Sequence, residues 1–150
     1  MRLVNNSEDI LDSRDVIDRR DELQEERDSI TAEIADLEAQ TADDPVYGEL
    51  DARRDTLRDE LNAWDEENAA ELAALNAFIA QGSDEWEYGE ALVRDSYFIA
   101  YAQDFAEDIG AIDADAGWPA RCIDWERAAR ELRMDYTSAE FDGVTYWFRA

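Results

Sequence analysis

Histidine and lysine are both absent from this chain of 150 residues. Without histidine, the chain lacks the most common general base and the most common protein ligand of transition metals. The sequence also contains no glycine-rich phosphate loop and no Gly-x-Ser-x-Gly nucleophile elbow. We therefore expect a protein that is not an enzyme and that uses no cofactor and no metal.

Cysteine and long apolar runs are scarce as well. Cys122 is the single cysteine, so no disulfide can form within the chain. No apolar run approaches the roughly 20 residues of a membrane span, and the N-terminal segment lacks the apolar centre of a signal peptide. These features predict a cytoplasmic protein without a membrane partner.

Two features of the sequence are weak signals for a local site. Asp113, Asp115 and Gly117 resemble the start of a calcium-binding loop, but the glycine is fifth rather than sixth, and Asp124 stands where glutamate is required. We interpret this segment as an acidic turn. A lone cysteine without histidine is more often a small packing residue than a nucleophile, and we expect the same packing role for Trp118.

Charge is the dominant feature of the sequence. Forty Asp and Glu residues face 14 basic residues, all arginine, for a net charge of −26. A direct nucleic-acid binder needs a basic patch, whereas every cluster of arginines here is interleaved with acids, so we expect no direct binding of nucleic acid. Apolar residues make up 45 % of the chain, which favours a folded core over disorder.

The first 80 residues predict an antiparallel helical hairpin, which we treat as the first domain (1–80). Apolar residues recur every seven positions over 8–40, and Ser7 is a plausible N-cap. The segment 41–48 contains Pro45 and Gly48 and predicts a turn. A second apolar seam follows over 49–80. The seam is narrow, because arginine and asparagine occupy several inward positions: Arg20, Arg27, Arg54 and Asn68.

The rest of the chain predicts a linker over 81–89 and a small α+β domain over 90–150. We expect an amphipathic helix over 90–109 and a second helix that begins after Asp124 and ends near Met134. Asp142-Gly143 is a strong signal for a two-residue β-hairpin turn. The fold class predicted for the whole chain is therefore α+β, mostly helical, with a long helical hairpin followed by a small domain that ends in a β-hairpin.

This second domain resembles a known family. The runs YFIAYAQDFAEDIG, IDWERAARELRMDY and EFDGVTYWFR are similar to the C-terminal part of the ArdA antirestriction proteins. The resembling positions are Ile123, Asp124, Trp125, Ala129, Leu132, Gly143, Tyr146 and Phe148. ArdA proteins are dimeric mimics of B-form DNA, borne by phages and plasmids, that inhibit type I restriction-modification enzymes. They have three domains, whereas the first 80 residues here predict a hairpin, which leaves the target open.

The acids of the predicted hairpin follow helical spacings. Asp residues recur every three positions from Asp9 to Asp21, and every four positions from Asp51 to Asp59. Like charges four residues apart cost about 0.2–0.5 kcal/mol per pair, so helix stability alone does not explain them. We predict that the following acids mimic phosphates: Asp9, Asp12, Asp15, Asp18, Asp21, Glu22, Glu25, Asp28, Asp51, Asp55, Asp59, Asp65 and Glu66.

The charge pattern and the resemblance together predict a DNA mimic. It would bind a host defence complex that normally binds DNA, either a restriction-modification enzyme or a CRISPR-type complex, and it would act as a homodimer. The alternative is an acidic coiled-coil adaptor, in which the acids serve solubility or adaptation to salt. An ordinary solvated helix surface is the simplest interpretation of the same charges.

Overall fold

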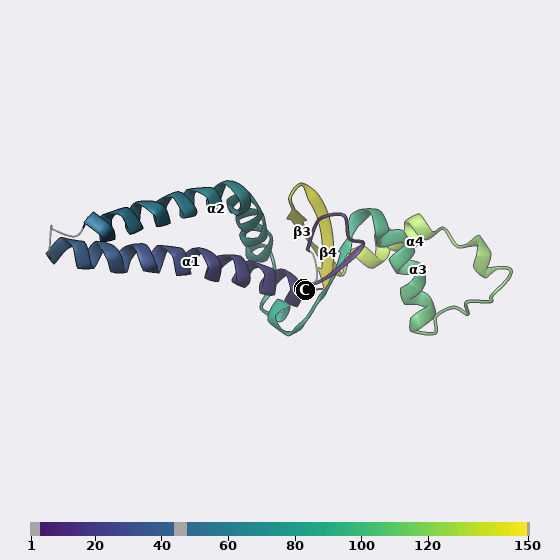
Figure 1. The fold of residues 1–150 in the computed structure, drawn as a ribbon. Coiled ribbons are helices and arrows are strands. Elements are labelled where there is room, and N and C mark those ends of the chain that lie inside the picture. The colour runs from purple at the N-terminus through teal and green to yellow at the C-terminus, as the bar shows by residue number, and fades with distance from the viewer. Residues whose placement is uncertain (1–3, 44–47, 150) are drawn as a thin grey trace. The chain divides into compact units, whose positions relative to one another are not determined.

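The computed structural model describes residues 4–43 and 48–149 of the chain (Figure 1). Its elements form the predicted α+β fold, with two long helices followed by a small region that ends in a β-hairpin. The chain divides into two compact units. We call residues 18–76 the hairpin unit, and residues 1–17 with 77–150 the sheet unit.

The hairpin unit consists of the larger parts of α1 (Ser13–Asp43) and α2 (Gly48–Ala80). The two helices are antiparallel, because contacts that move forward along α1 move backward along α2: Arg19 bonds to Glu71, and Arg27 to Asp65. The predicted hairpin is therefore confirmed, while most of its predicted turn lies outside the described residues. The buried apolar side chains of this unit are Leu23, Ile34, Leu57, Leu72 and Leu75.

The sheet unit contains an antiparallel sheet with the strand order β1-β2-β4-β3. The strands are β1 (Ile10–Asp12), β2 (Ala91–Arg94), β3 (Tyr136–Phe141) and β4 (Val144–Arg149). The predicted hairpin turn is confirmed: Asp142 and Gly143 both have positive φ, at 48° and 82°, as a tight two-residue turn requires. β4 lies at the centre of the sheet, between β2 and β3.

The predicted start of the first helix is wrong. Residues 10–12 form β1, and α1 begins at Ser13. The backbone pairs with the second strand instead, since Arg94 N–H donates to the Asp9 carbonyl at 2.8 Å and Leu11 lies opposite Leu92. The Asp12 carboxylate accepts a bond from the Arg14 backbone N–H at 2.9 Å and thereby caps the helix.

The segment around residue 90 also differs from the prediction. The expected helix over 90–109 is divided into β2, the short 3-10 helix η2 (Asp95–Tyr97) and α3 (Phe98–Asp108). Leu92 and Val93 are both fully buried, because both faces of the sheet are covered. The expected linker over 81–89 holds the 3-10 helix η1 (Asp84–Tyr88), whose Trp86 is a core residue.

Each face of the sheet has its own apolar core. On one face, Phe78 stacks on Phe141 with ring centroids 4.8 Å apart, and Trp86 contacts Phe148 edge-to-face at 5.2 Å. On the other face, Val93 packs with α3 and with α4 (Trp125–Arg133). As predicted, Asp124 caps α4, accepting a bond from the Arg127 N–H at 3.2 Å.

Candidate acidic interaction surface

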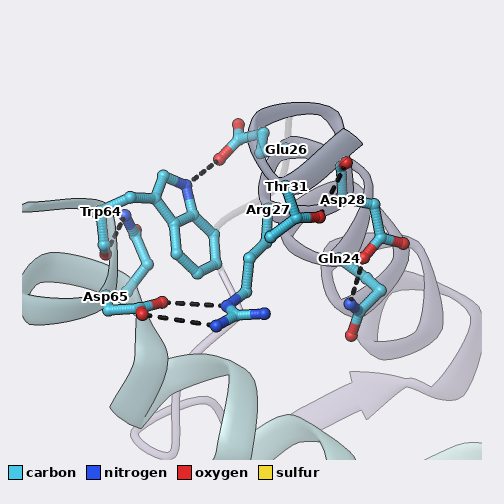
Figure 2. Close-up of polar contacts among 8 residues, drawn as sticks. Gln24, Glu26, Arg27, Asp28, Thr31, Trp64 and Asp65 are labelled. Carbon is cyan, nitrogen blue, oxygen red and sulfur yellow. Dashed lines mark hydrogen bonds and ion pairs between the residues drawn. The ribbon is translucent and has the colours of Figure 1, made fainter. Parts of the chain in front are cut away.

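The seam of the hairpin unit is built from polar contacts as well as leucines (Figure 2). The Arg27 guanidinium donates to both carboxylate oxygens of Asp65, at 3.0 and 3.4 Å, and Trp64 Nε1 donates to Glu26 at 3.0 Å. Arg19 makes a similar two-point contact with Glu71, at 2.8 and 3.2 Å. Arg27, which looks like a defect of the seam in the sequence, and Arg19 both join α1 to α2.

The carboxylates also act on the arginines electrostatically. The hydrogen bond and charge of Asp65 raise the pKa of Arg27, and those of Glu71 raise the pKa of Arg19. Both effects favour the charged form of a side chain that already stays protonated at neutral pH. The two arginines therefore act as fixed structural cations.

All six arginines of the hairpin unit are engaged with acids in this way. Arg53 pairs with Glu33, Arg58 with Glu38 and Arg20 with Asp21, while Arg54 lies beside Asp51 and Asp55. The unit contains 20 acids against these 6 arginines, for a net charge of −14. Among the described residues, the excess acids have no arginine of the same unit left to neutralise them.

A defined group of carboxylates remains after these pairs are assigned. Eight exposed acids of the hairpin unit have no ion pair or hydrogen bond to any described residue; we call them the unneutralised set. Two further acids of the unit are held by neutral donors, Glu26 by Trp64 and Asp28 by Gln24. The unneutralised set comprises Asp18, Glu25, Asp36, Glu49, Asp59, Glu60, Glu66 and Glu67.

Helix geometry places six of these acids in two rows. Asp18, Glu25 and Asp36 are separated by 7 and 11 residues, so at about 100° per residue they share one side of α1 within about 20°. Buried Leu23 lies about 140° away from Asp18 round the same axis, so this row faces away from the seam.

The second row lies on α2. Glu49, Glu60 and Glu67 are separated by 11 and 7 residues, and by the same geometry they share one side of that helix. Asp59 and Glu66 lie beside this row, about 100° round the helix. The rise between successive members of either row is about 10.5 or 16.5 Å.

The structure separates the predicted phosphate-mimicking acids into several groups. Asp18, Glu25, Asp59 and Glu66 belong to the unneutralised set. Six lie in the hairpin unit but are held by other side chains: Asp21, Glu22, Asp28, Asp51, Asp55 and Asp65. The remaining three, Asp9, Asp12 and Asp15, lie in the sheet unit.

The Asp residues that recur every three positions from Asp9 to Asp21 therefore do not form one row on a helix. Asp9 precedes β1 and Asp12 ends it, so that α1 carries the series from Asp15 onward. Asp12 also forms an ion pair with Arg14. The first acids of this series thus belong to the sheet unit, where Asp12 has a structural role as the cap of α1.

Four members of the unneutralised set were missed by the sequence reasoning: Asp36, Glu49, Glu60 and Glu67. Spacings of 7 and 11 were a usable signal, because both return to the same side of a helix. The sequence did not reveal which acids the arginines neutralise. Arg27 is followed directly by Asp28, yet its guanidinium bonds to Asp65, 38 residues away.

Two residues outside the hairpin unit differ from the prediction. Trp118 and Cys122, expected in the core, are exposed. No group of three or more metal-ligating side chains with suitable geometry occurs within residues 4–43 and 48–149. Neither long helix, as far as the structure describes it, has an apolar stretch that could cross a membrane.

Comparisons of the chain with models of known protein families, with curated proteins and with solved structures find no match.

Proposed function

We propose that this protein is a DNA mimic that is not an enzyme and that inhibits a host defence complex by occupying its DNA-binding surface. The observation that carries the proposal is the unneutralised set: eight exposed carboxylates on two antiparallel helices whose arginines are all engaged. Acids selected for helix stability alone would be offset by nearby cations. Here the excess of acids faces solvent.

The charge density is of the order that competition with DNA requires. Duplex DNA carries one charge per about 1.7 Å, or about 26 charges over a 45 Å length, and a protein contacts one side of it at a time. The hairpin unit has a net charge of −14 on helices of similar length. It therefore offers about as many charges as one side of a duplex.

The mechanism is competitive and involves no chemical step. The lysines and arginines with which the target neutralises phosphates pair with carboxylates of the hairpin unit instead. Each exposed pair contributes about 0–1 kcal/mol and is screened by salt, so affinity is a sum over many contacts. No cofactor takes part, and the protein itself does not bind nucleic acid.

The resemblance of residues 90–150 to the C-terminal part of ArdA proteins supports the same function and suggests the class of target. That class comprises restriction-modification enzymes and other DNA-binding defence complexes, including those of the CRISPR type. Such targets act in the cytoplasm of a bacterium that carries a phage or a plasmid, and we propose that location for this protein.

A competition assay tests the proposal. A purified type I restriction enzyme and a DNA-binding CRISPR effector are each incubated with labelled duplex DNA and increasing amounts of the protein. We expect displacement of DNA from at least one of them, with an apparent inhibition constant that rises at least about tenfold between 50 and 200 mM salt.

Two results would contradict the proposal. The first is that the protein displaces DNA from neither complex at 50 mM salt. The second is an inhibition constant, corrected for the weaker binding of DNA itself at higher salt, that does not rise with salt, which is the behaviour expected of an apolar contact made by a coiled-coil adaptor.

A further inference from the structure

The apolar core of the hairpin unit is small for its length. Five apolar side chains are buried among its described residues, against 14 in the described part of the sheet unit. All the buried aromatic residues of the described chain, including Phe78 and Trp86, lie in the sheet unit. The hairpin unit therefore has little apolar burial with which to oppose other forces.

Electrostatic repulsion is the main opposing force within this unit. Its net charge is −14, and its unneutralised acids lie in rows whose members are about 10.5 or 16.5 Å apart. Glu66 and Glu67 are adjacent, as are Asp59 and Glu60 one to two turns before them. Closing the hairpin lays α1 beside α2, so the folded form concentrates the net negative charge of both helices in one unit.

Salt acts unequally on the two kinds of electrostatic interaction. The ion pairs have atoms about 3 Å apart, as in Arg19–Glu71 at 2.8 Å and Arg27–Asp65 at 3.0 Å. The Debye length falls from about 30 Å at 0.01 M salt to about 8 Å at 0.15 M. Repulsion over 10–20 Å is thus only partly screened at 0.01 M salt and mostly screened at physiological salt, whereas contacts at 3 Å lose much less.

We infer that the concentration of dissolved cations controls whether the hairpin unit is folded. At low ionic strength, repulsion among the unneutralised acids opens the helical hairpin, and added cations close it. The sheet unit, with its larger core, stays folded in both conditions.

Hydrogen–deuterium exchange of the full chain, resolved by peptide, tests this inference at 10 and 300 mM NaCl at pH 7. We expect the protection of amides in 18–40 and 50–76 to rise about tenfold or more with salt. The protection of β2, β3 and β4 should change by less than about twofold. Equal protection of the hairpin unit at both salt concentrations, or weaker protection at 300 mM, would overturn the inference.

A matched pair of variants shows whether the unit's own acids are responsible. The first variant carries D18N, E25Q, E60Q and E67Q. The second changes four exposed acids of the sheet unit by the same total charge and carries E107Q, D108N, E126Q and D135N. The first should keep its hairpin unit protected at 10 mM salt and lose most of the salt response, whereas the second should behave as the parent does.

Two outcomes for the variants would contradict the inference. One is that the first variant loses protection of 18–40 and 50–76 at both salt concentrations. The other is that the second variant restores low-salt protection as fully as the first, because total charge would then matter rather than the charge within the hairpin unit.

Discussion

Neighbouring acids on α2 have opposite roles. Asp65 accepts two bonds from Arg27, whereas Glu66 is exposed and belongs to the unneutralised set. The same chemical change at these two positions should therefore have opposite effects on stability. Such a contrast separates the structural acids of the hairpin unit from the acids available to a partner.

We expect D65N to lower the free energy of unfolding by about 0.5–1 kcal/mol, because it breaks a half-exposed ion pair. E66Q should raise it slightly, because it removes one negative charge from a unit whose net charge is −14. Urea titrations followed by circular dichroism at 222 nm measure both changes. Shifts of the same sign for the two variants would show that the assigned pairing does not control stability.

Ser13 holds together three segments of the sheet unit. Its side chain is fully buried; Oγ donates to the Trp86 carbonyl at 2.7 Å and accepts from the Glu90 N–H at 2.7 Å. S13A leaves both backbone groups without this partner, so we expect a loss of about 1–3 kcal/mol in unfolding free energy. Thermal denaturation measures it, and S29A, at an exposed position of α1, is the matched control. Equal midpoints for the two variants would refute the role of Ser13.

Among the elements, the long helices were predictable and the short strands were not. Heptad spacing of residues such as Leu23 and Leu57 repeats over the whole length of each helix, so the pattern is strong. β1 has three residues, and its partner strand lies some 80 residues along the chain. Nothing near Leu11 in the sequence indicates that pairing.

β2 was missed for a different reason. Leu92 and Val93 fit the apolar stripe of the helix that follows them, so the pattern extends the helix backward. The structure buries both side chains because the sheet is covered on both faces, a condition under which strands lose their alternation. Whether both faces of a sheet are covered depends on segments that are distant in sequence. The local pattern of apolar residues therefore does not reveal it.

In the turn that follows α2, the backbone of Gly82 lies close to the indole ring of Trp86. A Cβ atom built on Gly82 would lie 2.5 Å from the Trp86 indole, which packs against Phe78 and Phe148. We expect G82A to lower the unfolding free energy by about 1–3 kcal/mol, because the ring must move within a packed core. Thermal denaturation tests this against G117A, where no atom lies within 4 Å of the added Cβ. A G82A midpoint no lower than that of G117A would contradict it.

For the whole molecule, we expect a homodimer that tightens as salt rises. The narrow seam of the hairpin leaves little apolar burial in one chain, and the ArdA proteins that residues 90–150 resemble are dimers. Burial of roughly 800 Å² per partner at about 25 cal/mol per Å² would favour association, and salt screens the repulsion between the two chains. Light scattering at low and moderate salt measures the mass. A monomer of 17.2 kDa at micromolar concentration in both conditions would refute this prediction.

The distribution of charge over the molecule decides between a mimic and a protein with a local site. The sum of many weak contacts predicts that one substitution matters little and that several together matter greatly. The most direct measurement is inhibition of DNA binding by the target at 50 mM salt, for D18N alone and for a variant with D18N, E25Q, D36N, E49Q, E60Q and E67Q.

We predict that D18N changes the inhibition constant by less than about fivefold, as expected from one exposed contact. The variant with six substitutions should stay folded and weaken inhibition at least about a hundredfold. The central claim is that the unneutralised carboxylates take the place of phosphates. Full inhibition by the folded variant with six substitutions would contradict it. Complete loss of inhibition from D18N alone would contradict it as well.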